Sequence, residues 1–443
     1  MKELTSGKPW KIILMFAIPI MCGNIFQQLY NLADSKIVST YISTNAFAAV
    51  GATSVISNTV IGFINGLTQG FAIPVANSYG ARDYNKMRRF IAGSMILTTA
   101  IAILLTIAGQ VFISDLLMGL DTPSDIMSDS LAYVKIILYG IILTAVYNLS
   151  ANLLRAVGDS KTPLYCLIAA VIVNVLLDFV FIKFMQMGIQ GAAYATVISQ
   201  ALAGGLCVIY IIKKFKIIIP EKKDWHLEKG QYPELITTGM SMGFMSCIVN
   251  IGSIVLQNAI NKLGTVYVAA HTAARKLFDI LTVSLYSVGL AMTTYVSQNM
   301  GAGKYARVIQ GIRHAILIVT AETTVLITLC FAFGNGILRW ITSTDDGTII
   351  SASVMYLRIS ILFFYVLGPL FVLRCSLQGM GHKIVPVSSS VLEMVVKILS
   401  ANLIVPAFAY KGVAFTEPIS WVLMTILLGV AYLIVKPAPA TDQ

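Results

Sequence analysis

The chain has 443 residues, of which 57% are hydrophobic and only 12% charged, and its mean hydropathy is +0.81. A soluble domain carries roughly a quarter charged residues, so this composition excludes an ordinary soluble protein and indicates an integral membrane protein. The formal net charge of +11 could suggest nucleic-acid binding, but the placement of the basic residues described below indicates membrane topology instead.

Apolar segments long enough to cross a bilayer recur along the whole chain, each of roughly 20 residues or more. The first, 10–33, is too long for a cleaved signal peptide. We predict an all-α membrane protein with twelve transmembrane helices. The predicted spans are 10–34, 46–79, 89–113, 130–157, 163–184, 191–213, 233–261, 267–298, 307–334, 350–380, 384–408 and 413–435.

Lysine and arginine are distributed unevenly over the ends and connections of these spans. Twenty-one lie at the two termini and in the connections that follow even-numbered helices. Five lie on the other side, namely Lys36, Lys183, Lys262, Arg339 and Lys411. By the positive-inside rule, both termini are predicted to be cytoplasmic.

Residues that carry enzyme or metal chemistry are sparse. All six cysteines fall inside apolar spans without a CxxC spacing, which indicates neither disulfides nor zinc. The four histidines are scattered, and no phosphate loop, nucleophile elbow or HExxH motif is present. We therefore expect no enzyme activity, no cofactor and no ATP hydrolysis by this chain.

Three segment pairs indicate an internal duplication. Segment 47–84 matches 268–305 at a constant shift of 221 residues, and 191–199 matches 412–420 at the same shift. In addition, "LRAVGDSKTP" (154–163) matches "LQGMGHKIVP" at a shift of 223. Because each copy has an even number of helices, the copies insert with the same orientation, as in parallel-repeat transporters.

The basic connection after the sixth helix divides the copies. We predict two pseudo-symmetric six-helix bundles around a central cleft. The predicted parts are an amino-terminal lobe at 1–213, a cytoplasmic linker at 214–232, a carboxy-terminal lobe at 233–436 and a tail at 437–443.

Polar residues follow a three-to-four spacing on several predicted helices, so each set shares one helix face. The first helix carries such a stripe at Asn24, Gln27, Gln28, Asn31 and Asp34, the fourth at Asn148, Asn152 and Arg155, the fifth at Asn174 and Asp178, and the seventh at Ser246, Asn250, Ser253, Gln257 and Asn261. A single such residue is ordinarily an interhelical hydrogen bond. Stripes in both halves favour a hydrated cavity.

Acidic residues within the spans fall into two groups. Arg275 with Asp279, and Glu393 with Lys397, are spaced as i,i+4 pairs and are interpreted as self-neutralised. Asp34 and Asp178 have no such partner, so each is either protonated or holds a cation. Glu322 is a further acid within a span to which the sequence assigns no role.

The motifs together resemble the multidrug and toxic compound extrusion family, within the multidrug/oligosaccharidyl-lipid/polysaccharide exporter superfamily. The similarity is carried by "FAAVGATSVI", "NSYGARDY", "LRAVGDSKTP", "GIQGAAYATVIS", "AAHTAARKLFDIL" and "SQNMGAGKY". The resemblance implies export of amphipathic, often cationic compounds in exchange for Na⁺ or H⁺. It also implies a multi-pass protein of the bacterial cytoplasmic membrane, which we expect to act as a monomer on small organic molecules, without nucleic acid.

Residue roles also follow from the resemblance. It implies a cation site at Asp34, Asn174, Asp178 and Thr196, a helix-bending proline at Pro19, and substrate contacts at Gln27, Tyr30, Asn31, Asn148 and Asn152. Two carboxylates, an amide and a hydroxyl are hard oxygen donors that suit Na⁺, but they could equally share a proton. A second family branch uses acids on the seventh and tenth helices, which this chain lacks, so a carboxy-lobe cation site is doubtful.

Three other functions fit the sequence less well. A lipid-linked oligosaccharide flippase of the same superfamily would need cationic side chains for a pyrophosphate, whereas these stripes are rich in amides. A membrane enzyme would need a nucleophile–base or metal-ligand set. A passive channel would not need two duplicated lobes. The coupling ion and the physiological substrate stay open at this point.

Overall fold

The computed structural model describes residues 3–120, 122–342 and 346–436. Over these ranges the secondary structure is helical, and no strand occurs. The contacts divide the chain into two units, which we call unit 1 (Cys22–Ser246 and the residues before Leu4) and unit 2 (Leu4–Met21 and the chain from Cys247 onward). Both divisions fall inside long helices, α1 (Pro9–Tyr41) and α8 (Gln231–Asn261). Each of these helices therefore contributes to both units.

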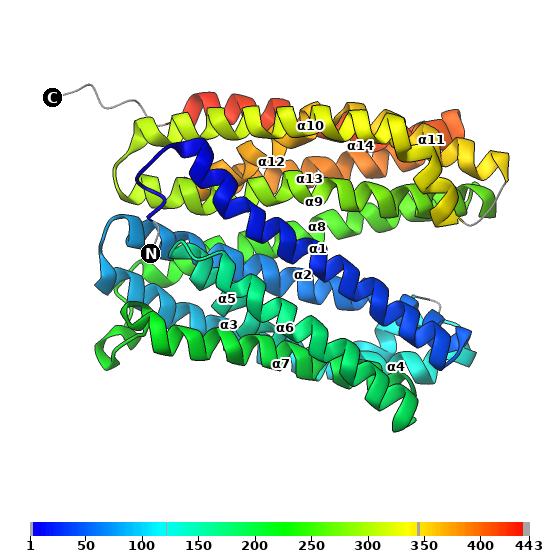
Figure 1. Ribbon diagram of the computed structural model, residues 1–443, viewed down its shortest axis with the longest axis horizontal. Helices are drawn as coiled ribbons and strands as arrows, with labels where there is room; N and C mark the ends of the chain where they lie inside the picture. The colour runs from blue at the N-terminus through cyan, green and yellow to red at the C-terminus, as the bar shows by residue number, and fades with distance from the viewer. Residues whose placement is uncertain (1–2, 121, 343–345, 437–443) are drawn as a thin grey trace. The chain divides into compact units, whose positions relative to one another are not determined.

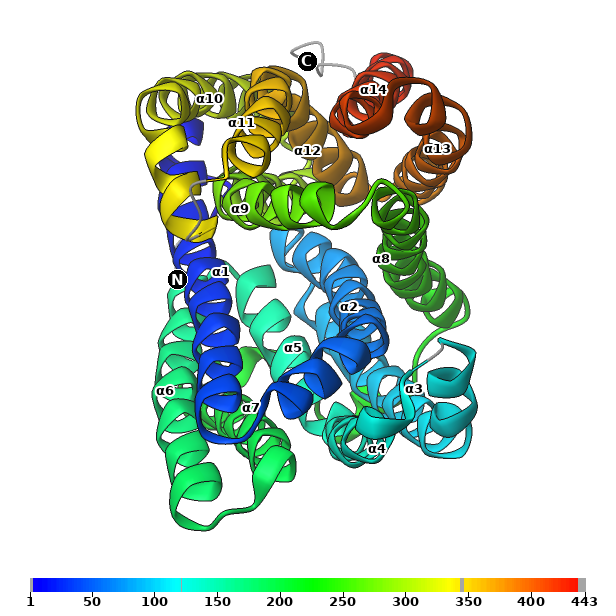
Figure 2. The same cartoon turned by 90° about the vertical axis from the view of Figure 1, so that its right-hand side faces the viewer.

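Unit 1 contains the six helices that follow α1 and a short linker. These elements are α2 (Thr44–Gly80), α3 (Tyr84–Gly119), α4 (Ser124–Tyr139), α5 (Ile141–Ala156), α6 (Lys161–Asp178), the π-helix η1 (Phe179–Phe184), α7 (Gly188–Lys214) and the 3₁₀ turns η2 (Lys216–Ile218) and η3 (Lys222–Trp225). Helix α2 packs on α3, α4 and α5, whereas α7 packs on α4, α5 and α6 (Figures 1 and 2).

Unit 2 repeats this arrangement. Its elements are α9 (Thr265–Gly301), α10 (Tyr305–Thr342), α11 (Gly347–Leu362), α12 (Phe364–Gly379), α13 (Ile384–Leu399), the π-helix η4 (Ser400–Ile404) and α14 (Val405–Val435). Helix α9 packs on α10, α11 and α12, and α14 packs on α11, α12 and α13. Helix α9 starts 221 residues after α2, and α11, α12 and α13 start 223 residues after α4, α5 and α6. The predicted duplication is therefore confirmed helix by helix.

The number of spans follows from helix length. Within the described ranges nine helices could cross a membrane, or up to eleven if each of the bent pairs α4–α5 and α11–α12 is one span. The run Ile384–Val435 has 52 residues, which at about 1.5 Å per residue exceeds twice a hydrocarbon core of about 30 Å. It is also broken at Ala409, where φ is 49° and ψ is −136°. If each bent pair is counted as one span and this long run as two, the total is the twelve spans predicted from the sequence.

Two predicted helices differ from the observed ones because they bend in the middle. The spans expected at 130–157 and 350–380 are the pairs α4–α5 and α11–α12, bent by 45° and 52°. The first bend lies at Gly140, where a Cβ atom would come within 2.3 Å of Val197 on α7. The bend therefore lies at a close helix contact that a hydropathy pattern does not reveal.

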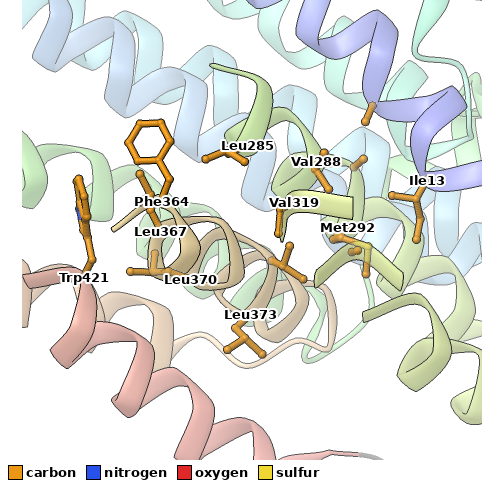
Figure 3. Packing of buried hydrophobic residues seen from close by; sticks show 14 of the residues in the cluster. Ile13, Leu285, Val288, Met292, Val319, Phe364, Leu367, Leu370, Leu373 and Trp421 are labelled. Atoms are coloured by element: carbon orange, nitrogen blue, oxygen red, sulfur yellow. The ribbon is translucent and has the colours of Figure 1, made fainter. Parts of the chain in front are cut away.

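The core of unit 2 is built from large apolar side chains of several helices. Figure 3 shows Phe364, Leu367, Leu370 and Leu373 of α12 lying among residues of α9, α10 and α14. The Phe278 and Trp421 rings are stacked with their centroids 5.8 Å apart. Ile13, on the first part of α1, belongs to the same cluster and is 1% exposed. Because lipid is as apolar as these side chains, this core is held by packing rather than by exclusion of water.

Close helix packing inside unit 1 leads to a first prediction, which concerns the stability of a glycine variant. Gly66 on α2 faces α8 so closely that a Cβ atom would lie 2.4 Å from the Met242 backbone oxygen. We expect Gly66→Ala to destabilise the protein by about 1–3 kcal/mol, because a backbone atom cannot rotate away. Gly205→Ala, where no atom lies within 4 Å of the added carbon, is the matched control. Unfolding of both variants in detergent measures the difference, and equal stabilities would contradict the packing argument.

The linker after α7 is attached to the start of α3. Arg88 Nε donates to Asp224 Oδ2 at 2.9 Å, and Asp224 is 1% exposed. Arg89 forms a second ion pair with Glu228. Hence this basic connection has a defined structure within unit 1. The lobe boundaries predicted from the sequence stay a prediction, and the tail predicted at 437–443 lies outside the described residues.

Candidate functional site

The unpaired acids predicted from the sequence are buried inside unit 1. Asp34, on α1, is 7% exposed, whereas Asn174 and Asp178, one turn apart on α6, are fully buried. On the opposite face of α6, Ile172 is 56% and Leu176 is 60% exposed. Because residues i and i+4 share a helix face, the polar pair points inward while the apolar residues face outward.

These buried groups have polar atoms without partners. Among the described residues, no hydrogen bond reaches Asp34 Oδ1, either side-chain atom of Asn174, or either carboxylate oxygen of Asp178. An unsatisfied buried polar atom ordinarily costs about 1–3 kcal/mol, and a charged group costs more. Native proteins tolerate few such atoms, and a bound ion or proton is one explanation. The arrangement is therefore suited to a ligand that supplies positive charge.

Thr196 joins α7 to α1 beside these acids. Its hydroxyl lies 2.9 Å from the hydroxyl of Tyr30, which is 8% exposed. Asp34 and Asp178 are close enough for their charges to interact, and both also interact electrostatically with the Tyr30 hydroxyl. The structure thus links Asp34, Thr196 and Asp178, from α1, α7 and α6, through Tyr30. Asn174 lies one turn before Asp178 on α6.

Tyr133 is a site residue that the sequence analysis missed. It lies on α4, is 8% exposed, and interacts electrostatically with both Asp34 and Asp178. Tyr133 belongs to a buried apolar cluster that includes Ile37 and Val38, so by its immediate surroundings it resembles an ordinary core residue. The available signal was its counterpart Tyr356, 223 residues later in the duplicated half.

The helix geometry changes directly after the acid pair. Asp178 is the last residue of α6, and the π-helical turn η1 begins at Phe179. Single π-turns within longer helices frequently occur at functional sites, because they re-aim the side chains around them. Lys183, within η1, lies over the Tyr41 ring at 5.3 Å. The nearest basic residue of this helix is thus engaged by an aromatic ring.

The predicted substrate residues are less closely grouped. Gln27 and Asn148 are half-buried and Asn31 is exposed. Asn152 is buried at 3% exposure, donates to Thr68 Oγ1 at 3.0 Å and accepts from Arg155 Nη1 at 3.0 Å. Both polar ends of Asn152 therefore have partners in the protein, so its predicted substrate contact requires that this network open.

Pro19 lies inside α1, which continues through it to Tyr41. Proline has no backbone N–H, so one hydrogen bond of this helix is absent there. The part of α1 that contains Pro19 belongs to unit 2, whereas the part that carries Tyr30 and Asp34 belongs to unit 1.

In contrast, six charged side chains of unit 2 are joined by ion pairs, namely Arg275, Asp279, Arg374, Glu393, Lys397 and Glu417. Both predicted i,i+4 pairs are confirmed, with Arg275–Asp279 at 3.0 Å and Lys397–Glu393 at 2.9 Å. Glu417, which the sequence analysis did not single out, accepts from Arg275 Nη1 at 2.6 Å. The sequence could have indicated Glu417, because it lies in segment 412–420, which repeats the segment 191–199 that contains Thr196. Glu322, by comparison, interacts with Ser284.

The donors in unit 1 fit Na⁺ or a proton better than a transition metal. In the part of the chain that the structure describes, no three His, Cys, Asp or Glu residues are grouped as metal ligands. The site instead combines two carboxylates with an amide and a hydroxyl, all hard oxygen donors. Four of its five atoms without hydrogen bonds are carboxylate or amide oxygens that a small cation could contact, and the fifth is the amide nitrogen of Asn174.

Comparisons with known proteins agree with the duplicated fold. The model of the family described as MatE matches residues 19–180 and 242–403, two segments displaced by 223 residues. The chain is 29% identical to a probable multidrug resistance protein, YpnP, of Bacillus subtilis, covering 86% of this chain and 84% of that protein. It is also 24% identical to an FAD transporter of Shewanella oneidensis, covering 99% and 98%. The crystal structure of MATE in complex with MaL6 superposes with a TM-score of 0.91 at 20% identity, covering 98% and 97%.

Proposed function

Because this chain belongs to the MatE family of membrane transporters, we propose that it is a cation-coupled antiporter. It exports amphipathic, often cationic organic compounds by alternating access, with Na⁺ or H⁺ as the coupling ion. The observation that carries the proposal is the group of buried oxygen and nitrogen atoms of Asp34, Asn174 and Asp178 without hydrogen-bond partners among the described residues.

The physical argument begins with the cost of two buried carboxylates. An ionised carboxylate inside the membrane is unfavourable unless a cation or a proton neutralises it. Two carboxylates that interact make the doubly charged state less favourable still. The stability of the site therefore depends on the ion supply, which differs on the two sides of an energised membrane.

Coupling requires the ion and the substrate to favour different states of the protein, and the effect of each on the other is reciprocal. Helix α1 supports such a link, because it carries Asp34 together with three of the predicted substrate residues, Gln27, Tyr30 and Asn31. Neutralising Asp34 removes a buried charge from this helix, which already lacks one hydrogen bond at Pro19. The helix would then adjust and weaken its contacts with the substrate.

Efflux from proteoliposomes tests the function directly. Purified protein is reconstituted into lipid vesicles, and the vesicles are loaded with a fluorescent organic cation. Release of this cation is then followed with an inward Na⁺ gradient, with an inward H⁺ gradient, or with neither. We expect one gradient to accelerate efflux above the level of protein-free vesicles. Equal rates under all three conditions would contradict ion coupling, and no efflux at all would contradict drug export.

The proposed localisation is a bacterial cytoplasmic membrane with both termini in the cytoplasm. It makes a labelling prediction for two exposed positions, Lys222 in the linker and Asp125 at the start of α4. In a variant without the six native cysteines, Lys222→Cys should react with a membrane-impermeant reagent only from the cytoplasm, and Asp125→Cys only from outside. Reaction of both from one face would contradict the span assignment.

A further inference from the structure

The duplication gives three residues of the unit 1 site a polar counterpart in unit 2. Asn174 corresponds to Lys397 and Tyr133 to Tyr356 at the shift of 223 residues that relates α6 to α13 and α4 to α11. Thr196 corresponds to Glu417 at the shift of 221 residues that relates 191–199 to 412–420. The acids of the two sites do not correspond in this way, because at the same shift Asp178 corresponds to Ala401, and Glu393 of unit 2 to Ala170.

In unit 2 the centre of this counterpart is occupied by a lysine. Lys397 is 2% exposed, and its ammonium nitrogen lies 2.9 Å from Glu393 Oε1, 3.1 Å from Ser253 Oγ and 3.9 Å from Glu417 Oε1. These three oxygens come from α13, α8 and α14. The counterparts of these helices are α6, α1 and α7, which supply the oxygens of the unit 1 site.

Glu417 is held in place by further partners. It accepts from Arg275 Nη1 at 2.6 Å, and its second oxygen accepts from the Tyr356 hydroxyl at 3.2 Å. Glu393 has a second cationic neighbour in Arg374, with 3.7 Å between Nη2 and Oε2. The carboxylates around the ammonium group are therefore positioned by other residues and do not depend on Lys397 alone for their orientation.

The two sites differ in the balance between positively and negatively charged side chains. The ion pairs of this unit 2 group join three cationic side chains, Arg275, Arg374 and Lys397, to three anionic ones, namely Asp279, Glu393 and Glu417. In unit 1, Asp34 and Asp178 leave buried oxygens without hydrogen bonds among the described residues. Both sites also adjoin a π-helical turn, η1 after Asp178 and η4 after α13.

We propose that the unit 2 counterpart of the cation site is permanently filled by the ammonium group of Lys397, and that truncating this side chain opens a binding site for one small monovalent cation. The comparison with unit 1 rests on the proposed function, whereas the unit 2 site itself rests on its own geometry. A tethered ammonium cannot dissociate, so this site carries no ion across the membrane. Coupling ions are then exchanged in unit 1 alone.

Chemical rescue tests the proposal. Lys397→Ala removes a propylammonium equivalent, and it should lower the melting temperature because Glu393 and Glu417 lose a shared cation. Adding propylammonium or Na⁺ should raise the melting temperature of the variant with a saturable dependence on concentration. The bulky tetramethylammonium ion should not. The measurement is made in an Asp178→Asn background, so that cation binding in unit 1 contributes less to the response.

Two further variants make the result decisive. Lys397→Ala combined with Glu417→Gln should lose the cation response, because the carboxylate that the ammonium group neutralised is gone. Lys397→Asn places the unit 1 residue at this position and should respond to cations like Lys397→Ala. If neither Lys397→Ala nor Lys397→Asn folds, or if neither gains stability with propylammonium or Na⁺, the proposal is wrong. Lys397 is then an ordinary ion-pair partner. No substrate or gradient is used, so this result is independent of the efflux assay.

Discussion

Replacing Asp178 with asparagine is expected to reduce ion-driven efflux to the level of protein-free vesicles while the protein still folds. The substitution keeps the shape of the side chain but removes a buried charge, whose oxygens have no hydrogen-bond partner within the described part of the chain. The melting temperature should therefore equal or exceed that of the unchanged protein, because burying an unpaired carboxylate is costly. Asp34→Asn should behave in the same way, since Asp34 is the second acid of the site.

The ion dependence of substrate binding distinguishes this loss from simple damage. In the unchanged protein, raising the concentration of the coupling ion should weaken binding of the organic cation, as reciprocity requires. In Asp178→Asn this dependence should disappear. Asp115→Asn is the matched control, because Asp115 is an exposed acid near the end of α3, and it should transport normally. Normal transport and unchanged ion dependence in both site variants would contradict the proposed coupling mechanism.

Replacing Glu417 with glutamine is expected to have the largest effect on stability. The change leaves Arg275 without its 2.6 Å partner and removes the acid 3.9 Å from Lys397. Removing one member of a buried ion pair ordinarily costs about 3–5 kcal/mol, because an uncompensated charge stays behind. Here the cost should lie at or below the lower end of this range, because the Arg275 side chain is 37% exposed and both cations keep a second acid. Denaturant unfolding in detergent measures the loss.

Two comparisons test the physical cause. Asp279→Asn also removes a partner of Arg275, but Asp279 has a side chain that is 45% exposed, so its loss should cost no more than about 1 kcal/mol. Combining Glu417→Gln with Lys397→Gln restores the charge balance and should recover part of the stability. If Glu417→Gln were as stable as the unchanged protein but had lost its ion coupling, Glu417 would belong to a working cation site.

Several features of the site were predictable because they depend on local sequence. A bilayer forces each span to satisfy its own backbone hydrogen bonds, so helices are the only option for these apolar segments. On such a helix the i,i+4 spacing of Asn174 and Asp178 places both on one face, and their burial confirms this interpretation. The same rule identified the pairs Arg275–Asp279 and Glu393–Lys397.

The missed residues share a different property. Glu417 pairs with Arg275, 142 residues away in sequence, and Tyr133 interacts with acids on two other helices. The partners that define these residues lie on other helices, so helical spacing within one segment does not identify them. Their roles become visible only when α4 is set beside its counterpart α11, and α7 beside α14.

By itself, the sequence determined the all-helical membrane class, the twelve spans, the duplication and the inward face of α6, because hydropathy and helical period act within one segment. Only the tertiary structure decided where the helices bend, as at Gly140 against Val197, and which charges are compensated. Compensation depends on side chains that approach from separate helices: Lys397 is neutralised by carboxylates of α13 and α14. Asp178, on the equivalent helix of unit 1, has no hydrogen-bond partner among the described residues.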